Sequence, residues 1–113
     1  MHIQHIEKGF RLSYRELLQI ARRVGKLATY CKRVKNEGSG IRIDSEYRST
    51  EKRQDQMKVM ITVELPGTIL RAESRRPDIA EAVDRCIEKL EPQVKRYKET
   101  NTGRGKMRRG KRR

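Results

Sequence analysis

The chain has 113 residues and a formal net charge of +14 at pH 7, and 39% of its residues are charged while 34% are hydrophobic. Its length predicts one domain with a short tail, and the small apolar fraction, with one Phe and no Trp, predicts a thin core between two layers. The positive charge indicates a polyanionic partner, and the lack of any run near the ~20 apolar residues of a membrane span, or of the apolar stretch of a signal peptide, favours a cytoplasmic protein without a membrane partner.

The first predicted element is a strand over Met1–Glu7. Its strongest apolar residues, Ile3 and Ile6, are spaced so that strict alternation is broken. Either a bulge intervenes in this strand, or His5 faces the core.

A helix is predicted to begin at Ser13, because residues 13–16 have the S-x-x-E form of a capping box. Apolar residues then follow at steps of three and four, which place them on one side of a helix. They are Leu17, Ile20, Val24, Leu27 and Cys31. The outer side is basic and carries Arg15, Arg22, Arg23, Lys26 and Arg33. A charged loop with glycines, over residues 32–40, ends this helix.

Three alternating runs then predict strands that each have one apolar and one polar face. They are Ile41–Arg48, Gln56–Leu65 and Thr68–Ser74. A polar loop over residues 49–55 joins the first two strands, and the Pro66-Gly67 turn joins the last two.

The last predicted helix, Asp78–Lys98, is the longest element, at roughly 31 Å for 1.5 Å of rise per residue. Its apolar side carries Ile79, Val83, Cys86, Ile87, Leu90, Val94 and Tyr97. Pro92 lies inside this pattern and removes one amide donor, at a cost of roughly 3 kcal/mol in a helix interior. Because the apolar residues continue past it, we expect a kink near Glu88–Pro92 and not the end of the helix.

The predicted order is β-α-β-β-β-α, which is an α+β two-layer sandwich. The first strand, the helix and the second strand form a βαβ unit with parallel strands, and the remaining strands follow as antiparallel hairpins. Because each strand offers one apolar face, both helices are expected on the same face of a four-stranded sheet, and the other face is expected to be polar.

The second half of the chain carries a recognisable set of residues. They are Leu70-Arg71-Ala72-Glu73, Asp78-Ile79, Ala82-Val83-Asp84, Lys89-Leu90-Glu91, Gln93 and Tyr97-Lys98. In the first helix, Arg23, Lys26-Leu27 and Tyr30 form an R-x-x-K-L-x-x-aromatic pattern. On these residues the chain resembles the short ribosome hibernation factors, which are hibernation promoting factor and the ribosome-associated inhibitor RaiA, also called protein Y. The resemblance covers residues 1–98 and implies the same β-α-β-β-β-α fold.

This resemblance implies a protein that binds the small ribosomal subunit and its 16S rRNA in the channel used by mRNA and tRNA. It would inhibit translation by steric occlusion and stabilise idle ribosomes under stress, with no enzymatic reaction, cofactor, metal or small-molecule substrate. Matched by position, the basic residues that would contact RNA are Arg23, Lys26, Lys89 and Arg96. Helical geometry alone adds Arg22, Arg85 and Lys95. We expect a monomer off the ribosome.

Residues 99–113 are predicted to form a basic, disordered tail, because they hold seven Lys and Arg, one acid and no apolar periodicity. Arg104, Arg108 and Arg109 in this tail are further candidate RNA-binding residues, since guanidinium groups match phosphate geometry. The tail differs from the acidic tail of RaiA, and we expect no second domain like that of the long hibernation factors, so the effect on ribosome dimerisation stays open. Pro92 and Thr29 stand where the family often has a basic residue.

The alternative function is a general double-stranded RNA-binding module or a ribosomal structural protein, because the same fold supports recognition of RNA by shape. A zinc site is disfavoured, since His2, His5, Cys31 and Cys86 contain no C-x-x-C pair. The two cysteines are expected to be free, buried thiols. No P-loop, GxGxxG or paired-carboxylate pattern indicates an enzyme.

Overall fold

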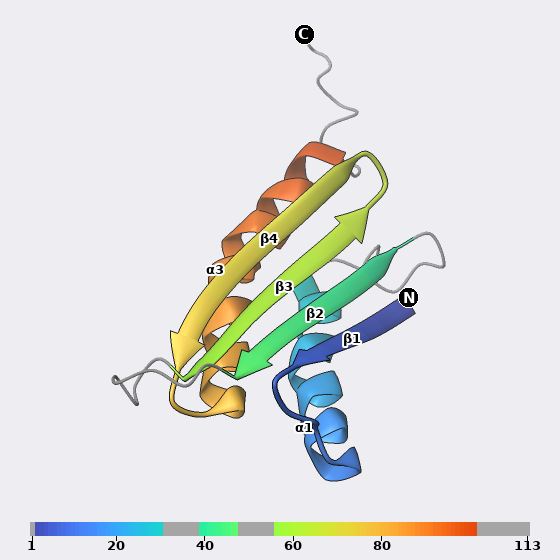
Figure 1. Cartoon of the computed structure of the whole chain (residues 1–113). Helices are drawn as coiled ribbons and strands as arrows, with labels where there is room; N and C mark the ends of the chain where they lie inside the picture. Colours follow the sequence, from blue (N-terminus) through green and yellow to red (C-terminus); the bar gives the residue numbers. More distant parts are fainter. Residues whose placement is uncertain (1, 31–38, 48–55, 102–113) are drawn as a thin grey trace, which may run out of the picture.

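The computed structural model describes residues 2–30, 39–47 and 56–101. Its elements are β1 His2–Lys8, α1 Tyr14–Gly25, α2 Leu27–Tyr30, β2 Gly40–Tyr47, β3 Met57–Leu65, β4 Thr68–Arg76 and α3 Ile79–Asn101 (Figure 1). This order confirms the predicted β-α-β-β-β-α fold, with the first helical segment divided into two pieces.

The four strands form one sheet in the order β1-β2-β3-β4. β1 is parallel to β2, and the other pairs are antiparallel. A parallel pair needs a crossover connection, which α1 and α2 provide. In Figure 1 the sheet lies in front, and α1 and α3 both lie behind it. The helices therefore cover a single face of the sheet, as the sequence predicts.

The register of β1 settles the choice between a bulge and an inward-facing His5. β1 pairs with β2 without a break from His2 opposite Gly40 to Lys8 opposite Glu46, so no bulge intervenes. His5 consequently shares a side with Ile3, which packs against the core. Its Nδ1 is buried and has no hydrogen-bond partner among the described residues, and burial lowers the pKa of this imidazole.

The start of α1 follows the predicted capping box. The Ser13 side chain accepts a hydrogen bond from the Glu16 amide at 3.1 Å, and the Glu16 carboxylate accepts one from the Ser13 amide at 2.9 Å. The predicted single helix is interrupted at Lys26, whose amide bonds to the Arg23 carbonyl at 3.1 Å, three residues back. Gly25, a poor helix former, ends α1 at this tighter turn.

α3 runs through Pro92 and ends at Asn101. It therefore continues past the proline, as predicted, and includes residues 99–101, which the sequence predicts to be part of the tail. Glu88 and Pro92 are both exposed, so water can satisfy the carbonyl that lacks its amide partner. Buried Val94 and Tyr97 lie beyond the proline, and their packing offsets its cost. The kink itself stays a prediction.

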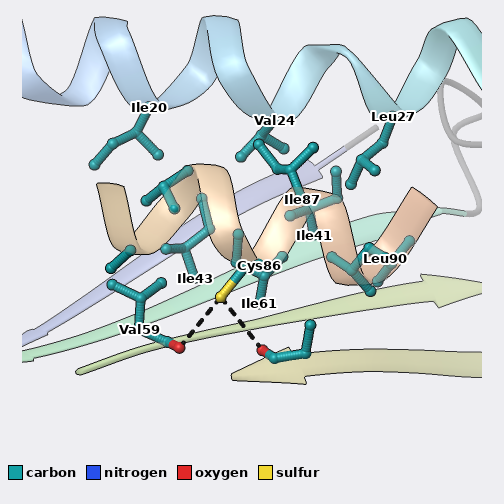
Figure 2. Close-up of a cluster of buried hydrophobic side chains, with 14 of the residues drawn as sticks. Ile20, Val24, Leu27, Ile41, Ile43, Val59, Ile61, Cys86, Ile87 and Leu90 are labelled. Atoms are coloured by element: carbon teal, nitrogen blue, oxygen red, sulfur yellow. Dashed lines mark hydrogen bonds between the residues drawn. The ribbon is translucent and has the colours of Figure 1, made fainter. Parts of the chain in front are cut away.

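The core lies between the helices and the covered face of the sheet (Figure 2). Its fully buried members include Ile20, Val24, Leu27, Ile41, Ile43, Val59, Ile61, Val63, Val83, Leu90 and Val94. Cys86 lies among them, and its thiol donates to the Val59 carbonyl at 3.3 Å and to the Ala72 carbonyl at 3.6 Å (Figure 2). Burial raises the pKa of this thiol, so it stays neutral and acts as a core residue. Cys31 lies outside the described residues.

Candidate nucleic-acid interface

The outer face of α1 is basic and open to solvent. Arg15, Arg22 and Lys26 are exposed, and their spacing of seven and four residues places them on one side of the helix. Within residues 2–30, 39–47 and 56–101, none of the three side chains makes an ion pair or hydrogen bond. The acid of this helix, Glu16, is committed to the capping box. These cations are therefore available to an external anion.

Arg23 lies on the side of α1 that faces α3. Its Nε donates to Oδ1 of Asp84 at 3.0 Å, and the two side chains are 30% and 49% exposed. Its Nη1 also bonds to the Gln19 carbonyl at 3.4 Å. Arg23, which the sequence predicts to contact RNA, therefore already forms an ion pair between the two helices.

A second polar bridge joins α2 to α3 further along. The Tyr30 hydroxyl donates to Glu91 at 3.1 Å, and Lys95 donates to the same carboxylate at 2.8 Å. The Lys95 ammonium lies 5.0 Å from the centre of the Tyr30 ring. The hydrogen bond from Lys95 lowers the pKa of Glu91, and the hydrogen bond to Glu91 raises the pKa of both Tyr30 and Lys95. Lys95 is thus held on the α2 side of α3 by a carboxylate that also anchors Tyr30.

Lys89 lies on the other side of α3, against the edge strand β4. Its ammonium donates to the Glu73 carbonyl at 2.6 Å, and Gln93 donates to the Arg71 carbonyl at 3.0 Å. These carbonyls are two residues apart and belong to β4, the last strand of the sheet that the described residues form. Lys89 and Gln93 therefore cover an open sheet edge, which otherwise presents unpaired backbone groups.

The two remaining predicted residues of α3 differ in their partners. Arg85 pairs with Glu88 at 3.1 Å on the same helix. Arg96 is exposed and lines a shallow hollow with Leu70, Gln93 and Tyr97. In the described part of the chain its guanidinium makes no ion pair or hydrogen bond.

The positive charge of the described residues is modest. Sixteen Lys and Arg against twelve Asp and Glu give +4, while the whole chain carries +14. α3 has no net charge, because it carries five basic and five acidic residues. The basic surface that the sequence predicts across both helices is therefore less positive on α3 than on α1. The other +10 belongs to residues 1, 31–38, 48–55 and 102–113, and Arg104, Arg108 and Arg109 all lie outside the described residues.

The uncovered face of the sheet is nearly neutral. Its charged side chains follow from the register and are Lys8, Arg42, Lys58, Arg71 and Arg75 against Asp44, Glu46, Glu64 and Glu73. Several are paired, such as Arg42 with Asp44 at 3.1 Å and Lys58 with Glu73 at 4.0 Å. This face lacks the excess of cations that the outer face of α1 shows.

Sequence reasoning missed the partners Asp84 and Glu91. The available signal was their spacing of seven residues, which equals the spacing of Arg23 and Tyr30 on the first helical segment. Two parallel helices with matching seven-residue intervals can form such paired bridges.

Other kinds of site find no support in the described ranges. Within residues 2–30, 39–47 and 56–101 no three His, Cys, Asp or Glu side chains form a group suited to a metal ion. Among the helices of the same ranges, none combines the length and the apolar composition needed to cross a bilayer.

Comparison with known proteins places these features in context. The family model described as sigma 54 modulation protein / S30EA ribosomal protein matches residues 8–102. A ribosome hibernation promotion factor of Staphylococcus aureus (strain COL) is 32% identical over 79 residues, which are 70% of this chain and 38% of that protein. This chain therefore spans well under half the length of that relative.

Two solved structures share the fold. The N-terminal domain of Thermus thermophilus Protein Y superposes with a TM-score of 0.68 and 22% identity, over 86% of this chain and 99% of that one. A ribosomal subunit interface protein from Coxiella burnetii superposes with a TM-score of 0.70 and 24% identity, over 87% of this chain and 98% of that one.

Proposed function

Because the chain belongs to the sigma 54 modulation protein / S30EA ribosomal protein family, we propose that it is a ribosome hibernation factor. It binds the small ribosomal subunit in the channel used by mRNA and tRNA, contacts 16S rRNA there, and blocks translation by occupying the space. Idle ribosomes are stabilised as a result. The protein acts in the cytoplasm, as a monomer when it is off the ribosome. The similarity to the ribosome hibernation promotion factor of Staphylococcus aureus supports this proposal.

The observation that carries the proposal is the outer face of α1. Arg22 and Lys26 are exposed one helical turn apart, and neither has an acidic partner among the described residues. Cations of this kind neutralise phosphates and release condensed counterions, which is the main source of affinity for RNA backbone. Arg96 on α3 offers a third exposed cation in the same state.

The ion-paired residues have a different role in this proposal. Arg23, Arg85 and Lys95 are held by carboxylates at the surface, and ion pairs at the surface contribute little to stability. An rRNA phosphate can therefore replace the carboxylate at small cost. Lys89 can reach RNA only by leaving the carbonyl of Glu73, so it contributes less than its position predicts.

Residues 102–113 contribute further cations to this proposal. Residues 102–113 hold seven Lys and Arg and no acid. Arg104, Arg108 and Arg109 bind phosphates along the rRNA, each by a two-pronged guanidinium contact.

The test is co-sedimentation of the full chain with purified small subunits. A hibernation factor is recovered with idle subunits and is displaced when mRNA and initiator tRNA are added. A general double-stranded RNA-binding module instead holds naked duplex RNA as tightly as it holds subunits, and it is not displaced. Retention in the presence of both mRNA and tRNA contradicts the proposed site.

A further inference from the structure

Two large apolar side chains are exposed on α1. Tyr14 is 76% exposed and Leu18 is 47% exposed. They are four residues apart and therefore neighbours on one side of the helix. Arg22 follows Leu18 after four more residues, so an aromatic ring, an aliphatic side chain and a guanidinium follow one another along roughly 12 Å of helix at 1.5 Å per residue.

The surroundings of this stripe are basic. Arg11 and Arg15 flank Tyr14 in the sequence and are exposed. Neither has an ion-pair or hydrogen-bond partner in the part of the chain that the structure describes. The nearby carboxylate of Glu16 accepts a hydrogen bond from the Ser13 amide, which ties it to the helix start.

An aromatic ring among unpaired guanidinium groups fits a nucleic acid better than a protein. The buried centre of a protein interface is depleted of charge, whereas a binding surface for single strands combines cations for the backbone with aromatic faces for the bases. The uncovered sheet face also exposes an apolar residue, Ile69, which is 59% exposed. Its surroundings are balanced between cations and acids, so they offer no such complementarity.

We propose that the exposed stripe of α1 is a stacking platform for an unpaired RNA base. The base lies on the ring of Tyr14 and extends over Leu18, while Arg15 and Arg22 hold the phosphates on either side. This inference rests on the proposed function and adds to it, because it assigns to α1 a contact with single-stranded rRNA and not with phosphates alone. Stacking of this kind tolerates any base, so the platform selects single strands over duplexes without reading sequence.

The experiment compares the full chain with Tyr14→Ala, Tyr14→Phe and the matched control Ile69→Ala. The probes are a short fluorescein-labelled oligoadenylate and a labelled duplex of equal length, followed by fluorescence anisotropy at several salt concentrations. Tyr14→Ala should weaken binding of the single strand about 5- to 150-fold, the range that corresponds to one stacked base. It should leave duplex affinity and the salt slope unchanged, because no charge is removed. Tyr14→Phe keeps the ring and should bind as the wild type does, as should Ile69→Ala.

Two results would overturn the platform. The first is a Tyr14→Ala protein that binds oligoadenylate as the wild type does, and if this protein also loses small subunits, the surface is assigned to a ribosomal protein. The second is an equal loss for Tyr14→Phe, which would assign the contact to the hydroxyl group. Co-sedimentation of the wild-type chain with small subunits is measured in parallel, so failure of the platform is distinguished from failure of the proposed function.

Discussion

The Tyr30 hydroxyl is bonded to the Glu91 carboxylate at 3.1 Å, across 61 residues of sequence, and the same 61 residues separate Arg23 from Asp84. Because both bridges join residues that are 61 positions apart, the first helical segment and α3 run in the same direction, and their successive turns lie side by side. The interruption at Lys26 lies between these bridges and does not break the alignment. The proposed RNA-binding surface therefore rests on two helices that are locked at two points.

Replacing Asp84 with Asn should increase RNA affinity while it slightly reduces stability. The substitution removes the charge that pairs with Arg23 and frees the guanidinium for a phosphate. Because the pair is part-exposed, the free energy of unfolding should fall by at most about 1 kcal/mol in urea denaturation. Asp84 competes with the phosphate for Arg23 in the wild-type protein, so the salt slope of small-subunit binding should rise by up to about 0.7–0.9, the value of one full phosphate contact.

The control for this variant is Glu73→Gln, which makes the same charge change on the uncovered sheet face. It should leave the salt slope as it is. An equal rise in both variants would mean that net charge alone, and not the freed Arg23, governs binding.

The Tyr30–Glu91–Lys95 bridge should make stability depend on pH in the acid range. The folded-state pKa of Glu91 lies below its ordinary value of 4.5, so the folded protein favours the ionised carboxyl. The stabilisation is therefore present above about 4.5, the unfolded pKa, and is lost as the pH falls through the lower folded pKa. In Glu91→Gln, the free energy of unfolding should fall less steeply as the pH decreases below about 4.5. This free energy is measured by denaturation followed by circular dichroism at several pH values. An unchanged slope in this variant would show that other carboxylates set the acid response.

Lys89 and Gln93, which cover the outer edge of β4, should prevent this edge from pairing with another copy of the chain. Gln93→Ala removes the donor to the Arg71 carbonyl, and Lys89→Met removes the donor to the Glu73 carbonyl while keeping most of the aliphatic chain. Each change should lower the free energy of unfolding by about 1 kcal/mol. The double variant should also sediment as larger species at high concentration, because an open edge pairs with other chains. A strictly monomeric double variant would show that the two side chains do not guard the edge.

The fold follows from the sequence because burial repeats with the period of each element. Val59, Ile61 and Val63 alternate along β3, and Cys86 and Leu90 recur at helical spacing on α3, and all are buried. The partners of the charged residues do not follow in this way. Whether Arg23 meets Asp84, or Lys89 meets a carbonyl of β4, depends on how the turns of one element align with another. Periodicity within a single element contains no such information.

The interruption at Lys26 escaped prediction for a related reason. A short turn in which Lys26 still has helical backbone angles keeps Leu27 and Ala28 on the buried side, so the apolar pattern continues through it. The exposure of Tyr14 could not be predicted from the sequence either. An aromatic residue at the start of a helix fits core packing and solvent exposure alike, and only the structure distinguishes them.

The sharpest test of the proposed surface is a pair of double variants that lose equal charge on opposite faces. Arg22→Gln with Lys26→Gln removes two exposed cations from the outer face of the first helical segment, and neither has an acidic partner among the described residues. Lys8→Gln with Arg71→Gln removes two exposed cations from the uncovered sheet face. Two lost phosphate contacts should lower the salt slope of small-subunit binding by about 1.4–1.8 in the first variant, and the second should keep the wild-type slope. Both should unfold at the wild-type urea concentration, since none of the four side chains is buried. An equal decrease in the two slopes would mean that the long-range charge of the whole chain drives binding, and the assignment of the interface to α1 would then be wrong.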